Sequence, residues 1–379
     1  MRNCPKYFKS CWRICTKECA CVCEIVCRSG ACSLAKRSGS FIKIFSSSWW
    51  FAHATVSPRT VSYELGKIME SNVASKGVID ARSGDMPYDL YGWDRSGSDR
   101  HALEKAVELR LAELDRCGVA MQVLCAPRAL VKSCGNDRDR LRHCNSALKE
   151  MVDISCGRLA ALALLDLDDG EFGAAAFQQA MEHGFHGVAV PTSYSGKRID
   201  DAEFQPLLSF AARHRKPVFI YSEGLGDGGP QIDQRQQENV GVSVDLAICL
   251  ARLIFRGHFE QLPELLVFLD QGGGAAPSLI SRWDHGYRVR RECQALIPHP
   301  PSRYLNNVFF DASTLDNAAL TAAINSIGPQ QIVFASAERS LDGELDRARR
   351  TFGESDSENQ ALLYTQNNAA RLYGGGKSL

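Results

Sequence analysis

From residue 77 onward, short apolar runs rich in β-branched residues alternate with longer amphipathic stretches. The short runs are almost continuously apolar, which is typical of strands in a parallel sheet that is covered on its outer face. The pattern therefore predicts an α/β protein with a parallel sheet. Eight strands are predicted, at residues 77–81, 121–126, 159–167, 187–191, 217–222, 265–270, 308–313 and 332–337.

Helices are predicted between these strands, where apolar residues recur at helical spacing, as in "HALEKAVELRLAELDRCG". Eight strand and helix units in about 300 residues indicate a (β/α)8 TIM barrel. An open, doubly wound parallel sheet is the alternative. The predicted helices include residues 101–118, 140–154, 173–184, 202–215, 243–257 and 317–328.

Composition and charge limit the partners of the chain. Its 379 residues are 45% hydrophobic, which is enough for a buried core in one large domain or two ordinary ones. Lysines and arginines number 44, as do aspartates and glutamates. This balance predicts no affinity for nucleic acid or for an anionic membrane.

The first 68 residues differ from the rest of the chain. They hold 11 lysines and arginines against 3 acidic residues, a net charge of +8, which leaves 33 against 41, or −8, for the remainder. Eight of the fifteen cysteines fall within the first 32 residues, without the CxxC spacing of zinc modules. We expect residues 1–68 to be a disordered extension, or sequence upstream of a start at Met69. A transit peptide and a cysteine-rich metal module are the alternatives.

The remaining cysteines are scattered through apolar settings such as "MQVLCA" and "DLAICLARL". Reduced, buried thiols explain them. We therefore expect a cytoplasmic protein, with organelle targeting by the extension as the alternative, and a barrel domain over residues 77–374.

Candidate chemistry is expected at the C-terminal ends of the strands, where barrel enzymes build their sites. No histidine lies at these predicted ends. One end is the turn "DQGGG", in which three glycines follow the neutral amide of Gln271. Such a turn has the form of a catalytic loop without a side chain that transfers protons.

Several segments together resemble a known family. They include "VIDARSGDMP", "LDRCGVAMQVLCAP", "VFLDQGGG", "SRWDHGYRVR" and "NNAARLYG". In this order, over about 300 residues, they resemble the branch of the amidohydrolase-related superfamily that contains 2-amino-3-carboxymuconate-6-semialdehyde decarboxylase (ACMSD). The resemblance implies a TIM barrel of the metal-dependent amidohydrolase type.

The resemblance also implies a divalent metal, usually zinc, which activates water by lowering its pKa from about 15.7 to about 7. Members have two histidines in IDxHxH on the first strand and another at the end of the fifth. A histidine before GGG serves as acid and base, and an aspartate in GSDxP ends the eighth strand. The corresponding positions here are Arg82, Gly84, Tyr221, Gln271 and Ala337.

These departures predict that the metal ligands and the acid/base are lost and that no cofactor is bound. Arg82 would place a permanent positive charge where the metal sits. Repulsion from a metal ion 4 Å away would cost about 4 kcal/mol for each like unit charge at a dielectric constant of about 20. We therefore predict a catalytically inactive relative, a pseudoenzyme, with a binding or regulatory role.

An active carboxy-lyase or hydrolase with a rebuilt or metal-free site is the alternative. Oxygen ligands suit Mg²⁺, Mn²⁺ or Ca²⁺, and Arg82 and Arg282 would clamp a carboxylate in a metal-free decarboxylation. The carboxylates at or beside the predicted strand ends are Asp80, Asp85, Glu223, Asp270 and Glu338.

A small anionic ligand and a protein partner are the remaining predictions. Arg282 falls where ACMSD relatives have an arginine that reaches the substrate carboxylate across a dimer interface, so we expect a homodimer or pairing with an active homologue. The candidate ligand-binding residues are Arg82, Tyr221, Asp270, Gln271, Gly272, Gly273, Gly274 and Arg282.

Overall fold

Eight parallel strands form one sheet in the order β1-β2-β3-β4-β7-β8-β9-β10. Their bounds are β1 (Val78–Ser83), β2 (Val119–Leu124), β3 (Leu159–Leu164), β4 (Gly187–Pro191), β7 (Val218–Tyr221), β8 (Val267–Leu269), β9 (Val308–Asp311) and β10 (Ile332–Val333). Each predicted strand is present. The computed structural model describes residues 78–83, 100–126, 137–167, 173–225, 233–313, 315–337, 340–352 and 363–374.

The first and last strands meet and close the sheet into a barrel. The Ala81 amide donates a hydrogen bond to the Phe334 carbonyl at 2.9 Å, and the Ala337 amide donates one to the Arg82 carbonyl at 3.0 Å. Ser83 and Ala337 also form an isolated parallel bridge. The predicted TIM barrel is confirmed, and the open doubly wound sheet is excluded.

The last strand is shorter than predicted. The run 332–337 is buried throughout and apolar except for Ser336, but ladder pairing of β10 with β9 covers only Ile332 and Val333. The amide of Phe334 donates instead to the Tyr364 carbonyl at 3.1 Å, and Ala337 has a positive φ of 53°. The chain therefore leaves extended geometry while it still closes the barrel.

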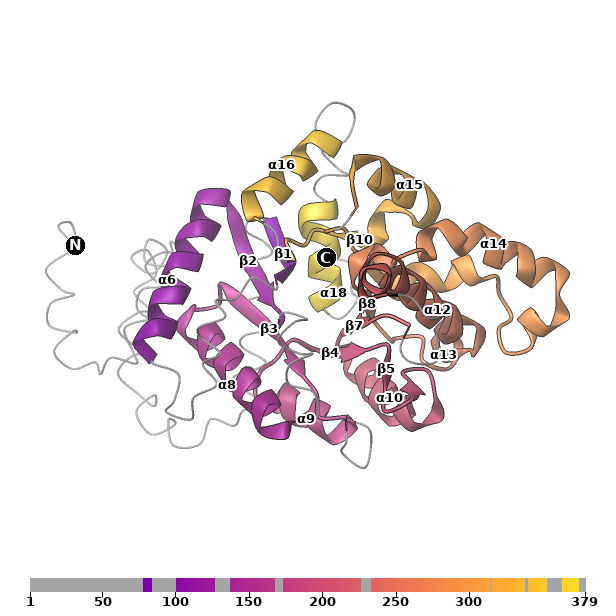
Figure 1. Cartoon of the computed structure of the whole chain (residues 1–379), viewed down its shortest axis with the longest axis horizontal. Helices are drawn as coiled ribbons and strands as arrows, with labels where there is room; N and C mark the ends of the chain where they lie inside the picture. The colour runs from indigo at the N-terminus through magenta and orange to yellow at the C-terminus, as the bar shows by residue number, and fades with distance from the viewer. Residues whose placement is uncertain are drawn as a thin grey trace, which may run out of the picture. The chain divides into compact units, whose positions relative to one another are not determined.

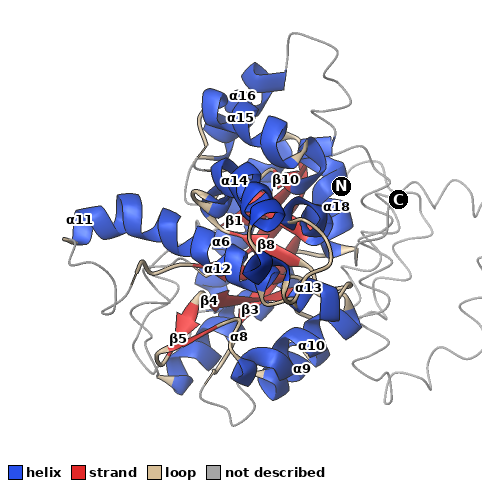
Figure 2. Ribbon diagram, turned by 90° about the vertical axis from the view of Figure 1, so that its right-hand side faces the viewer, coloured by secondary structure: helices blue, strands red, loops and turns tan. Residues whose placement is uncertain are grey.

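The helices surround the strands (Figures 1 and 2). All six helices named from the sequence are present. The described helices are α6 (Arg100–Cys117), α8 (Arg138–Ile154), α9 (Ala174–Glu182), α10 (Gln205–His214), α11 (Gln234–Gln236), α12 (Val242–Phe255), α13 (His258–Gln261), α14 (Ala276–Val289), α15 (Asn317–Ile327), α16 (Leu341–Phe352) and α18 (Asn368–Tyr373).

Shorter elements join them, including an antiparallel hairpin that follows β4. It consists of β5 (Ser193–Tyr194) and β6 (Lys197–Arg198). The 3-10 turns are η3 (Ala202–Phe204), η5 (Gln271–Gly273), η6 (Arg291–Gln294), η7 (Pro301–Asn307) and η8 (Pro329–Gln331), and the π-turns are η4 (Gln237–Gly241) and η9 (Leu363–Asn367).

Two helices begin at aspartate caps that the sequence supplies. The Asp137 carboxylate accepts hydrogen bonds from the amides of Asp139 and Arg140 at 3.1 and 3.2 Å. Asp316 accepts one from the amide of Ala319 at 2.8 Å. These bonds satisfy amides that have no partner within the helix, and they fix where α8 and α15 start.

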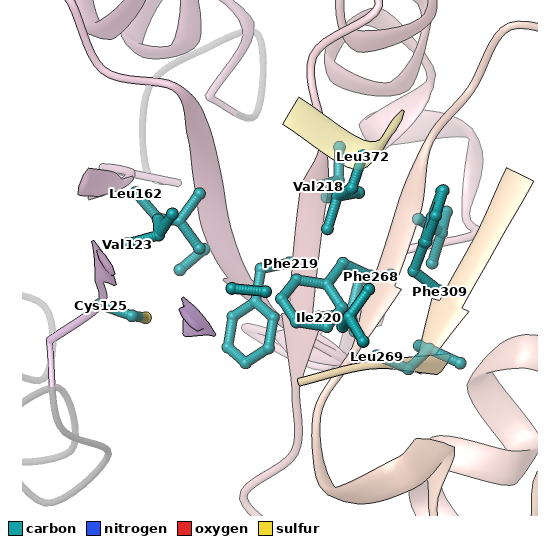
Figure 3. Packing of buried hydrophobic residues seen from close by; sticks show 14 of the residues in the cluster. Val123, Cys125, Leu162, Val218, Phe219, Ile220, Phe268, Leu269, Phe309 and Leu372 are labelled. Atoms are coloured by element: carbon teal, nitrogen blue, oxygen red, sulfur yellow. The ribbon is translucent and has the colours of Figure 1, made fainter. Parts of the chain in front are cut away.

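The core is continuous from the barrel interior to the inner faces of the helices. Phe219 of β7 and Phe268 of β8 pack with their ring centroids 5.0 Å apart (Figure 3). Both are 1% exposed or less. Strands that are buried on both faces explain the near-continuous apolar runs of the sequence.

The described cysteines are free thiols, and four of them (Cys117, Cys125, Cys144 and Cys249) are buried. None of the described helices is long and apolar enough to span a lipid bilayer. Residues 1–68, for which a disordered extension is predicted, lie outside the described residues.

His186 is a buried titratable group at the N-terminal end of the barrel, just before β4. It is 8% exposed. Burial lowers its pKa to about 3, and the ammonium groups of Lys216 and Lys149 lower it as well. The imidazole is therefore neutral in the folded protein near neutral pH.

We predict that His186→Gln flattens the dependence of stability on pH. The folded-state pKa lies below the unfolded value of 6.5, so the wild-type chain should lose stability as the pH falls from 6.5 towards 3. The expected loss relative to the variant is about 1 kcal/mol for each pH unit below 6.5. Urea unfolding at pH 7, 6 and 5 measures it. His183→Gln, at an exposed position after α9, is the control, and an unchanged slope in His186→Gln would contradict the assignment.

Candidate functional site

The C-terminal ends of β1, β8 and β9 bring one arginine and two aspartates together. Arg82 Nε donates to Asp311 Oδ2 at 2.7 Å, and Arg82 Nη2 donates to Asp270 Oδ1 at 2.8 Å. Both aspartates are 0% exposed and Arg82 is 5% exposed. We call these three residues the mouth triad.

The mouth triad pairs its one guanidinium with both of its carboxylates. One guanidinium faces two carboxylates, so its formal charge is −1. Burial lowers the pKa of Arg82, but the charges of Asp270 and Asp311 outweigh burial and raise the pKa above its ordinary value. The guanidinium carbon also lies 5.2 Å from the ring centroid of Phe219, within the range of a cation–π contact. Arg82 is therefore permanently charged and already paired.

Asp80, two residues before Arg82, serves a different purpose. Its carboxylate accepts hydrogen bonds from the Ser336 amide at 2.9 Å, the Ser336 hydroxyl at 2.6 Å and Gln122 Nε2 at 2.8 Å. Burial raises the pKa of Asp80 to about 6, against the lowering effect of these hydrogen bonds. The side chain joins β1 to β2 and to the segment after β10.

The glycine turn after β8 has an unusual backbone. Gln271, Gly272, Gly273 and Gly274 have φ values of 48°, 64°, 71° and 61°, all in the left-handed region that glycine tolerates best. A Cβ on Gly273 would lie 2.6 Å from the ring of Phe310. The turn therefore requires glycine for packing as well as for conformation.

Gln271 and Ala337 are two of the five described non-glycine residues with positive φ. Asparagine, aspartate and histidine are the non-glycine residues most often found there. The resemblance implies histidine at the first position and aspartate at the second. Both positions thus keep a backbone conformation that suits those residues, although neither residue is present.

A second buried polar cluster lies beside the barrel ends of β4 and β7. Asp245 of α12 accepts hydrogen bonds from the hydroxyls of Thr192 and Ser222, the latter at 2.6 Å. Arg198 of β6 donates to the other carboxylate oxygen at 2.8 Å. This cluster fastens the β5–β6 hairpin to α12 and fixes the chain that follows Tyr221.

A model of the amidohydrolase family matches residues 135–375 of the chain. The chain belongs to the amidohydrolase family. A 2-amino-3-carboxymuconate-6-semialdehyde decarboxylase of Dictyostelium discoideum is 26% identical over 264 residues, which cover 66% of this chain and 73% of that protein. The decarboxylase of the same name from Caenorhabditis elegans is 27% identical over 111 residues, which cover 29% of this chain and 28% of that one.

Solved structures of decarboxylases share the fold of this amidohydrolase. The 2,6-dihydroxybenzoate decarboxylase from Rhizobium has a TM-score of 0.60 at 22% identity, over 78% of this chain and 98% of that one. The 5-carboxyvanillate decarboxylase from Sphingomonas paucimobilis has a TM-score of 0.63 at 18% identity, over the same shares of the two chains. At these identities the likeness concerns the barrel alone.

The described residues at the mouth of this amidohydrolase do not fit the divalent metal that the resemblance implies. Within the described ranges, no three His, Cys, Asp or Glu side chains are grouped so that they could hold a metal ion. Asp270 and Asp311 converge, but a guanidinium, which has no electron pair to donate, lies between them.

The predicted site residues are only partly brought together. Arg82 and Asp270 are in contact, and Gln271 follows directly. Tyr221 ends β7 and is 6% exposed, whereas Arg282 is exposed on α14. Gly84, Asp85 and Glu338 lie outside the described residues.

Sequence reasoning missed Asp311 and Asp245. Asp311 lies within the predicted strand 308–313, and a carboxylate near the end of an apolar strand is the signal that identifies it. Asp245 follows "VSV" at the start of an otherwise apolar helix, a pattern that resembles an ordinary helix start. Nothing in the sequence pairs it with Thr192 and Ser222.

We predict that Ala337→Gly stabilises the protein by about 0.5–1 kcal/mol, because glycine adopts a positive φ without the clash of a Cβ. The hydrogen bond from the residue 337 amide to Arg82 is retained. Chemical denaturation measures the change in unfolding free energy. Ala335→Gly is the matched control, since Ala335 is buried on the same segment and has no positive φ, and it should destabilise. Destabilisation by both substitutions would show that the strain at Ala337 is absent.

Proposed function

We propose that this amidohydrolase does not catalyse metal-dependent decarboxylation and acts as a binding or regulatory protein. The observation that carries the proposal is the position of the Arg82 guanidinium between Asp270 and Asp311. A cation held by two buried charge-assisted hydrogen bonds disfavours a second cation at the same place. The geometry thus supports a barrel that works without the family's metal.

The glycine turn supports the same proposal. A neutral amide such as Gln271 neither accepts nor releases a proton near neutral pH, and loss of a general acid or base typically lowers rates by about 10²- to 10⁴-fold. Loss of a metal that activates water removes a further, larger contribution. The two losses together leave little of the family's reaction.

An active carboxy-lyase or hydrolase with a rebuilt site is the second candidate. Asp80 favours it, because its pKa of about 6 allows proton exchange near neutral pH. The hydrogen bonds from Ser336 and Gln122 nevertheless engage both of its carboxylate oxygens. A substrate would have to displace them before Asp80 could act.

The small anionic ligand predicted for the mouth faces a similar obstacle. Arg82 was its proposed anchor, and an anion there would compete with Asp270 and Asp311 for the same guanidinium. Arg282, which is exposed, has no such competitor among the ion pairs of the described residues. If an anion binds, Arg282 is the better anchor.

We expect the purified 379-residue chain to carry no stoichiometric metal and to leave 2-amino-3-carboxymuconate-6-semialdehyde unchanged. Elemental analysis after purification without chelator measures the first, and loss of substrate absorbance measures the second. The Dictyostelium decarboxylase serves as the positive control for the assay. About one metal per chain together with turnover would overturn the proposal in favour of the rebuilt site.

We further propose that the protein self-associates through the region of α14. Arg282 is exposed there, and two large apolar residues close together in the chain, Val289 and Leu296, are 62% and 58% exposed. Sedimentation at micromolar concentration should show a dimer, and Val289→Asp with Leu296→Asp should shift it to monomer. Leu109→Asp is the control, since Leu109 on α6 is 64% exposed. A wild-type monomer would contradict self-association.

A further inference from the structure

We propose that the mouth of the barrel is a cation site shaped for a planar guanidinium, and that Arg82 fills it from within the chain. The inference rests on the proposed function, in which no metal ion lies at the mouth. It names the cation that pairs with the buried carboxylates in the absence of a metal. The site consists of the carboxylates of Asp270 and Asp311, with the ring of Phe219 against the guanidinium. We call the Arg82 side chain a tethered ligand, because it fills this site while it remains part of the chain.

The charge of the two carboxylates demands a cation. Asp270 and Asp311 end neighbouring strands, and both are fully buried. Buried carboxylates are costly unless they are paired and hydrogen-bonded. The described residues supply one cation in contact with both, which is Arg82.

The geometry of the contacts selects a guanidinium over other cations. Arg82 directs Nε to one carboxylate and Nη2 to the other, at 2.7 and 2.8 Å, so two N–H groups of one planar fork address two separate acceptors. An ammonium is a compact point charge that lacks this fork. Phe219 adds a flat apolar surface, 5.2 Å from the guanidinium carbon, which suits a delocalised cation.

The backbone holds the tethered ligand in place. The Arg82 carbonyl accepts a hydrogen bond from the Ala337 amide at 3.0 Å, and the Ser83 carbonyl accepts one from the Cys125 amide at 2.9 Å. The Tyr373 hydroxyl donates to the Ala81 carbonyl at 2.6 Å. Because β1 is fixed on both sides, truncation of the Arg82 side chain should leave the carboxylates and their surroundings in position.

The experiment is chemical rescue of Arg82→Ala. We expect the variant to melt about 5–10 °C below the wild type, because two buried carboxylates lose their cation. Guanidinium chloride at about 1–20 mM, well below denaturing concentrations, should recover at least half of this shift relative to sodium chloride at the same concentration. Mg²⁺ should recover less, because it prefers several oxygen ligands in octahedral geometry.

Arg110→Ala is the matched control. Arg110 is also a buried arginine, at 9% exposure, and its partners include the neutral side chains of Gln122 and Ser83. Guanidinium should not raise the melting temperature of this variant or of the wild type. An equal response of Arg110→Ala, or an equal effect of Mg²⁺ on Arg82→Ala, would overturn the guanidinium site.

A double-mutant cycle keeps the inference testable if Arg82→Ala does not fold. Asp270→Asn leaves the guanidinium with one carboxylate and Arg82→Gln leaves the carboxylates without a cation, so each should lower the melting temperature. The double variant should lose less melting temperature than the sum of the two single shifts, and additive losses would overturn the pairing.

Turnover by the wild type would instead overturn the proposed function and leave the rescue result standing.

Discussion

The structure depends on the compensation of two buried carboxylates by one guanidinium. Asp270 and Asp311 lie at 0% exposure at the ends of neighbouring strands, where an unpaired charge would be strongly destabilising. Their partner comes from β1, which meets these strands through β10 when the barrel closes. Arg82 also accepts the hydrogen bond from the Ala337 amide that helps to close it. Closure and charge compensation therefore depend on each other.

Much of the fold could be predicted from the sequence, because strands buried on both faces appear as near-continuous apolar runs. The predicted strand 187–191 coincides with β4 (Gly187–Pro191), and α15 (Asn317–Ile327) differs from its prediction by a single residue. The last strand was less predictable. Its apolar run continues to Ala337, yet ladder pairing ends at Val333 because Phe334 bonds to Tyr364 instead. Hydrophobicity reports burial, and it does not report which backbone groups pair.

The candidate site was harder to predict, because its interactions join residues far apart in the chain. Arg82 was identified as a charge in the wrong place for a metal, but its contacts with Asp270 and Asp311 span 188 and 229 positions. Only barrel closure brings them together. Without those partners, Arg82 looks like an anchor for an anion. With them, it is a cation already paired with two carboxylates, and an anion would have to compete with both for the guanidinium.

The glycine turn shows that packing alone is enough to preserve the backbone form of a catalytic loop. Gly273 packs against Phe310, and a Cβ on Gly274 would lie 2.2 Å from the carbonyl oxygen of Ser243. Packing therefore fixes the backbone of the turn, whichever side chain precedes it. Gln271, directly before these glycines, also has a left-handed conformation. Because packing requires these glycines, the presence of "GGG" says little about activity by itself. The charges of the mouth triad say more about which ions can occupy the mouth than the glycines do.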